Sequence, residues 1–570
     1  MSEMNRGSEA NRETARAIDP LALGALWRGL AAAANDGGLI LQRTAYSEAV
    51  REGRDFSVAV FDARGRMIAQ GDFSPGHLGS MPGMIDRILE CYPREDIRPG
   101  DVYAFNDPWM GSGHLPDWMV AAPFFHDGEL AGYAVTCVHM IDVGGASPGS
   151  QQVVGISENY QEGVRLTPTR LWREGEPNAE VVRLLEANVR VPDKLLGDLR
   201  ANRNAGRVVG QRVTELVARF GRKAYDEGCD ALLDLSEQAL RDAIRDMPDG
   251  VYRAFDHLDD CGPDTDPIRI EAAITIDGGD LTLDFTGSDP QTRSGMNAVE
   301  NYTRAYCYFT IKAITHGYRI PQNVGALRPI HWIAPEGTIV NLKRPGGNGG
   351  RAIMQQRIVD VLMQAFAQAV PDRVVAPSSH WANPIISGTD QATGRRFVFY
   401  DVIVGGFGGR ADSDGPEAMS ASFNIDTIPT EVNEHSYPVV VERYELIPDS
   451  AGAGRFRGGH GVRKEVRVLG EDLQLSNLAE RQRIAPPGVR GGEAGSVGKT
   501  VIVSTSGERR QVHSKGTYPL QTGDLVCHTV SGGAGYGDPR ERDPEAIERD
   551  LRLGLLTPEK AARVYGHPQR

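Results

Sequence analysis

The 570-residue sequence predicts a mixed α+β protein built from several domains. In the first third, short apolar stretches alternate with turns rich in glycine and aspartate, which is the pattern of antiparallel hairpins. Residues 178–246 instead follow a helical period, and the chain after residue 438 returns to short strands between glycines. The length is sufficient for two to four domains.

We expect five parts along the chain. They are a disordered N-terminus (1–18), a hairpin-rich N-terminal metal-site domain with a helical segment (19–250), a mixed α/β middle domain (251–435), a β-rich module (436–540) and a helical tail (541–570). The N-terminal domain should open with a helix over 20–46, interrupted near Asn35-Asp36-Gly37-Gly38. Hairpins are predicted for 56–61 with 67–70, and for 119–125 with 130–139. Buried helices are expected over 301–315 and 353–370.

Composition excludes several classes of function. The formal charge of −14 is not offset by a basic stripe, so we expect no nucleic-acid binding. No run of 18 apolar residues is present, so we expect no membrane span. Six scattered cysteines without a close pair, and a polar N-terminus, predict a reduced, cytoplasmic protein.

Two short motifs in the first third suggest a metal site. His114 and Asp117 lie three residues apart beside Gly113, and His139 and Asp142 repeat this spacing before two glycines. Imidazole nitrogens and carboxylate oxygens suit a divalent metal such as zinc, manganese or iron. The hairpin between the motifs would return His139 to the neighbourhood of His114. Asp beside glycine is also an ordinary turn former, so the spacing by itself leaves both interpretations open.

Many further stretches, in order along the chain, make the sequence resemble the hydantoinase B/oxoprolinase family over nearly its whole length. They include residues 52–57 (EGRDFS), 77–82 (HLGSMP), 98–101 (RPGD), 106–108 (NDP), 113–117 (GHLPD), 142–149, 160–163 (YQEG), 197–200 (GDLR), 284–288 (DFTGS), 323–329, 452–459 (GAGRFRGG) and 533–539 (GAGYGDP).

This resemblance implies a hydrolase that opens a cyclic amide, a hydantoin or a lactam, with ATP bound by a partner. The partner is a hydantoinase A-type subunit in a hetero-oligomer, and this chain has no Gly-x-x-x-x-Gly-Lys-Ser/Thr loop of its own. The family's metal and catalytic positions map onto Asp55, His114, Asp117 and His139. Asp142 is adjacent, as a ligand of a second metal or a residue that supports the ligands, and Asp55 is the general base or orients the water. The usual His-His-Ala-Asp pattern reads His139-Met140-Ile141-Asp142 here, so one family histidine is replaced by Met140.

Other functions remain open at this stage. A related subunit occurs in acetone and acetophenone carboxylases, where a metal would stabilise an enolate. The chain can also be a non-catalytic scaffold, or a metallohydrolase that acts without ATP. His77 and Glu162 each suit either a site or a packing role, and Cys137 is expected to be a buried small hydrophobe.

Overall fold

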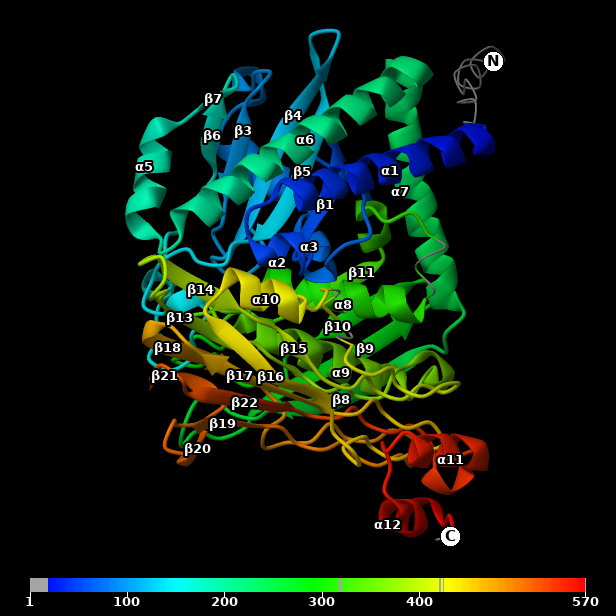
Figure 1. Cartoon of the computed structure of the whole chain (residues 1–570). Helices are drawn as coiled ribbons and strands as arrows, with labels where there is room; N and C mark the ends of the chain where they lie inside the picture. Colours follow the sequence, from blue (N-terminus) through cyan, green and yellow to red (C-terminus); the bar gives the residue numbers. More distant parts are fainter. Residues whose placement is uncertain (1–18, 316, 318–319, 420–421, 424, 569–570) are drawn as a thin grey trace, which may run out of the picture.

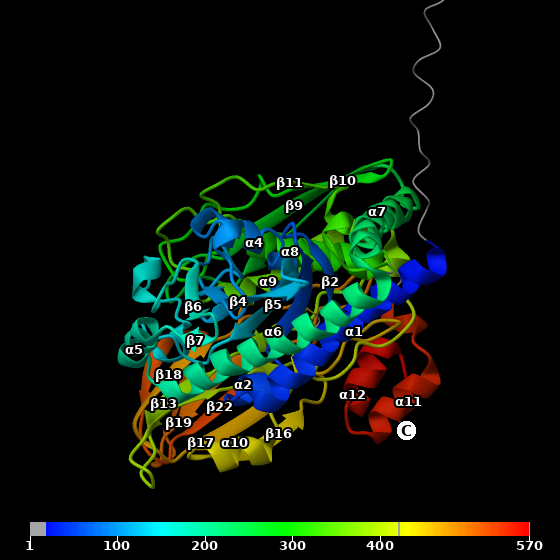
Figure 2. The same ribbon diagram turned by 90° about the horizontal axis from the view of Figure 1, so that it is seen from above.

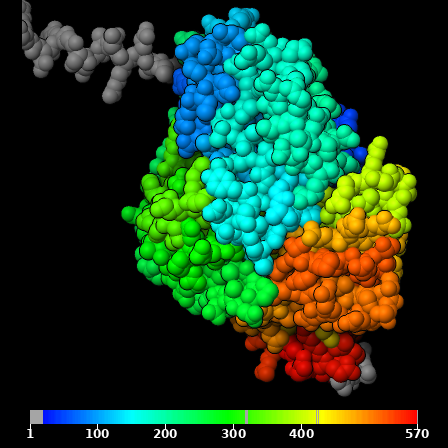
Figure 3. All heavy atoms as spheres, turned by 90° about the vertical axis from the view of Figure 1, so that its left-hand side faces the viewer, coloured from blue at the N-terminus to red at the C-terminus, as the bar shows by residue number. Residues whose placement is uncertain are grey.

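The computed structural model describes residues 19–315, 317, 320–419, 422–423 and 425–568, so the disorder expected for residues 1–18 falls outside the described part. The mixed α+β class is confirmed. Segments of the N-terminal third lie above the middle segments and the C-terminal strands, and the C-terminal tail lies at the bottom (Figures 1 and 3).

A seven-stranded sheet organises the N-terminal part, and every neighbouring pair in it is antiparallel. Its order is β2-β1-β5-β4-β3-β6-β7. The strands are β1 (Phe56–Asp62), β2 (Met67–Gln70), β3 (Val102–Phe105), β4 (Asp117–His126), β5 (Glu129–His139), β6 (Thr169–Arg173) and β7 (Glu176–Pro177). Both predicted hairpins, β1–β2 and β4–β5, are therefore confirmed.

Helices cover both faces of this sheet. Helices α1 (Pro20–Thr44) and α6 (Pro192–Phe220) lie side by side across one face (Figure 2). Val58, Trp118 and Val138 belong to the core on this side. Phe61 and Cys137 belong to the opposite core, against the short helices α3 (Pro75–Ser80) and α4 (Met84–Cys91). Since side chains alternate along a strand, the α3 face receives every second residue.

The expected break in the first helix is wrong, because α1 runs without interruption through Asn35-Asp36-Gly37-Gly38. A Cβ atom on Gly37 would lie 2.3 Å from Cγ2 of Val209, and one on Gly38 would lie 2.0 Å from Cζ of Phe73. The glycines therefore permit close packing of α1 against its neighbours, and they do not end the helix.

The helical segment and the middle part follow the predicted pattern. The helical segment comprises α5 (Ala179–Asn188), α6 and α7 (Arg222–Arg245). A four-stranded sheet of order β11-β10-β9-β8 comes next, with β8 (Gly250–Leu258), β9 (Ile268–Asp277), β10 (Asp280–Asp284) and β11 (Ile330–Ile333). The buried helices α8 (Glu300–Ile314) and α9 (Gln355–Phe366) pack together, and α9 contacts this sheet.

Strands from both sides of residue 435 share one sheet. Its order is β14-β13-β18-β21, with β13 (Ile385–Thr389), β14 (Arg396–Tyr400), β18 (Glu471–Leu478) and β21 (Lys515–Leu520). It shares a core with a five-stranded sheet of order β16-β17-β22-β19-β20. Those strands are β16 (Val439–Leu446), β17 (Val462–Val468), β19 (Lys499–Val503), β20 (Arg509–Val512) and β22 (Leu525–Val530).

Short elements complete the chain. They are α2 (Glu48–Arg51), the pair β12 (Trp381–Ala382) and β15 (Ile403–Val404), α10 (Thr430–Ser436), and the tail helices α11 (Pro544–Arg552) and α12 (Pro558–Lys560). Among the described helices, none combines the length and apolar composition that a bilayer crossing requires.

Candidate metal centre

The ends of three adjacent strands bring the predicted site residues together. The register of β4 and β5 pairs Asp117 directly with His139. The backbone N–H of His139 donates to the carbonyl oxygen of Asp55, just before β1, at 3.1 Å. By strand alternation Asp55, Asp117 and His139 share the α3 face of the sheet. His114 lies in the loop that precedes β4.

Two imidazoles converge on one carboxylate oxygen. Nε2 of His114 lies 2.9 Å from Oδ1 of Asp117, and Nδ1 of His139 lies 3.0 Å from the same oxygen. The three residues are 2, 1 and 2% exposed, and one ligand atom from each lies within 4.8 Å of the others. Nε2 of His114 has no hydrogen-bond partner of acceptable geometry among the described residues. This donor set fits a divalent metal such as zinc, manganese or iron.

The charges of these groups suit cation binding. Burial, helped by the nearby Arg351 guanidinium, lowers the pKa of His114 to about 3, so its imidazole is neutral and keeps a lone pair. Burial alone would raise the pKa of Asp117, but the positive charges of Arg351 and His77 hold that pKa well below its usual range. The centre therefore offers an anionic oxygen beside a neutral nitrogen.

Asp55 and His77 border the same carboxylate. Nε2 of His77, on α3, lies 3.5 Å from Oδ2 of Asp117 and 3.8 Å from Oδ1 of Asp55. Burial raises the pKa of Asp55. Its Oδ1 is buried without a hydrogen-bond partner among the described residues. Asp55 thus carries a free acceptor next to the candidate metal ligands.

A second group of potential ligands, His77, Asp117 and Cys137, shares the same aspartate. Oδ2 of Asp117 is already contacted by the guanidinium of Arg351 and the hydroxyl of Ser112. Burial also raises the pKa of the Cys137 thiol, which disfavours the thiolate that a metal needs. The His114–Asp117–His139 group is therefore the better cation site of the two.

Asp142 lies outside this cluster, which departs from the expectation that it is a further metal ligand. Its Oδ1 accepts a hydrogen bond from Nη1 of Arg190 at 2.8 Å, and its Oδ2 accepts from the N–H groups of Gly144 (3.1 Å) and Arg190 (2.8 Å). Both oxygens are engaged in holding the loop after β5. We therefore leave Asp142 out of the ligand set.

Residues distant in the sequence complete the centre, and sequence patterns did not reveal them. Arg351 lies just before α9, and its guanidinium stacks 3.8 Å from the ring centroid of Tyr302 on α8. Nε2 of Gln151 lies 3.4 Å from Nε2 of His139, and the Tyr400 ring lies 5.0 Å from the His139 ring. These contacts depend on tertiary packing, so no local signal marks them.

Glu162, for which the sequence left two roles open, holds a loop behind His114. Its Oε1 accepts hydrogen bonds from the N–H groups of Asn348 and Gly349, both at 2.6 Å, and its Oε2 accepts from Asn159 at 2.7 Å. The carbonyl oxygen of Gly349 in turn lies 3.4 Å from Nδ1 of His114. Glu162 therefore supports the orientation of that imidazole through the loop.

Comparisons with known proteins identify the family of this chain. The family model described as hydantoinase B/oxoprolinase matches residues 19–539. The B-type subunit of a putative D-/L-hydantoinase from Pseudomonas sp. (strain NS671) is 34% identical over 565 residues, which cover 96% of this chain and 95% of the relative.

Two solved structures share the fold. The ATP-dependent caprolactamase from Pseudomonas jessenii superposes with a TM-score of 0.87 at 28% identity, covering 96% of each chain. A nucleotide-free acetone carboxylase superposes with a TM-score of 0.88 at 20% identity, covering 96% of this chain and 80% of the other, which shows a common fold alone. The match to the family model and the close relative together show that this chain belongs to the hydantoinase B/oxoprolinase family.

Proposed function

We propose that this chain is the B-type subunit of an ATP-dependent hydrolase that opens a cyclic amide, a hydantoin or a lactam. The observation that carries the proposal is the convergence of His114 and His139 on one buried oxygen of Asp117. The names of its relatives, a putative hydantoinase and an ATP-dependent caprolactamase, support this reaction class. ATP would be bound by a hydantoinase A-type partner.

In this proposal His114, Asp117 and His139 hold one divalent metal. Such an ion makes water more acidic and polarises an amide oxygen. Side chains of this protein would carry out the proton transfer. Asp55 would accept the proton of the attacking water, since its Oδ1 is buried without a hydrogen-bond partner among the described residues and burial raises the pKa of this carboxyl group. His77, 3.8 Å from that oxygen, orients the carboxylate.

Activation of the substrate lies outside this centre. A ring amide resists water because its nitrogen is a poor leaving group, so the partner would phosphorylate the amide oxygen with ATP. Attack of one water at the same carbon would break the C–N bond and leave a free amine and an acyl phosphate, and a second water would release phosphate and give the open-chain carboxylate. The same buried centre also suits a ketone carboxylase, but the acetone carboxylase likeness is limited to the fold, whereas the hydantoinase relative is 34% identical.

Activity of the chain mixed with its A-type partner tests the proposal. We expect ring opening of a hydantoin or lactam that requires ATP, and a decrease of about 100-fold or more for Asp55→Asn with its bound metal unchanged. Asp127→Asn, at the exposed tip of the β4–β5 hairpin, is the matched control and should retain full activity. Full activity of Asp55→Asn would contradict the assigned base. Carboxylation of a ketone with bicarbonate, without ring opening, would favour the carboxylase instead.

A further inference from the structure

A cavity lies on the other side of α3 from the candidate metal centre. Its volume is about 750 Å³, within the range of small-molecule sites. Leu78 and Gly79 of α3 line it, whereas His77 points to the metal centre. Helices α3 and α8 are in close contact here, since a Cβ atom on Gly76 would lie 2.2 Å from the Tyr306 hydroxyl.

Most of the cavity wall is apolar. The loop between β2 and α3 and the side of α8 supply one part of it, and Val404, Phe407, residues 418–419 and residues 425–427 supply another. Its larger apolar side chains include Leu78, Phe309, Phe407 and Ile425. An apolar wall of this size favours a ligand with a hydrocarbon or aromatic body.

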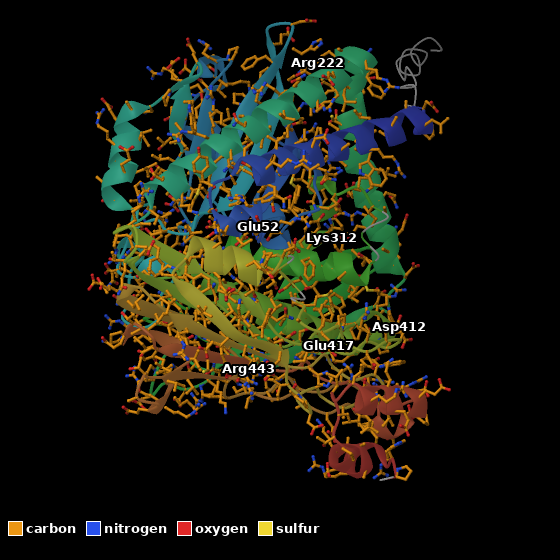
Figure 4. The ribbon with its side chains drawn as sticks, in the orientation of Figure 1. Glu52, Arg222, Lys312, Asp412, Glu417 and Arg443 are labelled. Carbon is orange, nitrogen blue, oxygen red and sulfur yellow. The ribbon has the colours of Figure 1, made fainter. Side chains whose placement is uncertain are left out.

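One cation faces this apolar space. Lys312 of α8 is half-buried. Figure 4 shows it below the N-terminal helix α1 and above the C-terminal strands. Among the described residues no carboxylate lies within ion-pair distance of its ammonium group, whose nearest aromatic contact is the Tyr308 ring at 5.2 Å. Burial lowers the pKa of Lys312 to about 8. The carboxylate of Asp72 lies beyond ion-pair distance, and its charge only partly offsets this lowering. A desolvated ammonium that no carboxylate contacts directly is costly, so a ligand that supplies an anionic oxygen would gain binding energy here.

Nearby carboxylates restrict the charge of such a ligand. Asp72 lines the cavity and accepts a hydrogen bond from Asn35 at 3.2 Å. Asp426 also lines it and pairs with Arg54 at 3.1 Å. Among the described lining residues, two carboxylates beside the ammonium of Lys312 would repel a polyphosphate or a dicarboxylate. A singly charged ligand therefore suits the cavity best.

We propose that this cavity is a binding site for a small organic monocarboxylate, whose carboxylate contacts Lys312 and whose apolar body packs against Leu78, Phe407 and Ile425. The site is separate from the metal centre and does not depend on the proposed hydrolysis.

Calorimetric titration of the whole chain with hexanoate or benzoate, without ATP or partner, tests this proposal. We expect saturable binding to the wild type, a loss of about tenfold or more in Lys312→Met, and retention in Lys312→Arg. Lys223→Met, which changes a lysine side chain that is 90% exposed on α7, should bind like the wild type. Hexanamide and pyrophosphate should bind at least about tenfold more weakly than hexanoate. Absence of saturable carboxylate binding, or equal affinity of the wild type and Lys312→Met, would overturn the proposal.

A second measurement uses the wild type alone and so does not depend on how the variants fold. Because its pKa is about 8, the Lys312 amine should react with trinitrobenzenesulfonate at pH 8 faster than an exposed lysine does. We expect hexanoate to slow the labelling of Lys312, read by mass spectrometry of its peptide, and to leave Lys223 unaffected. Equal labelling rates with and without hexanoate would contradict occupancy at Lys312.

Discussion

Replacing Arg351 by methionine tests the charge balance of the metal centre. The side chains of Arg351 and Asp117 are 3 and 1% exposed, and the guanidinium contacts Oδ2 of the carboxylate. Removing one partner of a buried ion pair leaves an uncompensated charge and typically costs about 3–5 kcal/mol. We expect Arg351→Met to lose about this much stability in metal-free protein. Bound zinc at Oδ1 should reduce the loss, since the ion takes over part of the neutralisation.

Thermal unfolding in a chelator and in excess zinc measures this difference. Arg87→Met is the matched control, because Arg87 is 48% exposed and pairs with Glu90 on the surface of α4. The control should unfold like the wild type in both conditions. An equal loss for Arg351→Met with and without zinc would show that the metal does not share Asp117 with Arg351. If Arg351→Met were as stable as the wild type in the chelator, the charge argument itself would be refuted.

Two further predictions concern buried carboxylates away from the ligands. Burial raises the pKa of Asp198 from 3.8 to about 6, so ionisation of this carboxyl group opposes folding above pH 6 and not below pH 4. Thermal unfolding should therefore show that Asp198→Asn gains about 3 kcal/mol of stability relative to the wild type between pH 4 and pH 7. A difference in stability that stays constant over this pH range would contradict the prediction. The asparagine side chain would keep an oxygen for the N–H groups of Tyr46 and Ser47, which donate to Oδ1 of Asp198 at 2.7 and 3.1 Å. Glu162→Ala should weaken metal binding by about 10- to 100-fold in chelator competition, because the loop that orients His114 loses its anchor; unchanged affinity would contradict a positioning role.

Local sequence signals were sufficient for the hairpins, whereas the candidate ligands were selected by their spacing together with the family resemblance. Alternating apolar residues and a His-Asp-Gly turn predict β4 and β5, and the paired register then brings Asp117 opposite His139. His114 and Asp117 lie only three residues apart, so the sequence alone shows that they are neighbours. These features depend on residues near each other in the chain, so periodicity and turn chemistry reveal them.

Other features depend on contacts between distant segments. Arg351 reaches Asp117 across 234 residues, and no pattern around it indicates a partner. In the sequence Gly37 suggests a break in the helix, but in the structure Val209 of α6 packs against it and the helix continues. Asp142 has the same spacing from His139 as Asp117 has from His114, yet Arg190 neutralises it instead. Sequence spacing identifies candidate ligands, but neighbours from elsewhere in the chain decide which of them face the centre.

The metal content of the purified chain tests the central claim most directly. Elemental analysis after dialysis should find about one equivalent of a divalent metal in the wild type and in His126→Ala, whose imidazole lies at the tip of the β4–β5 hairpin. His114→Ala and His139→Ala should each retain less than about a tenth of that amount. Equal metal content in all four proteins would contradict a cation held by His114, Asp117 and His139.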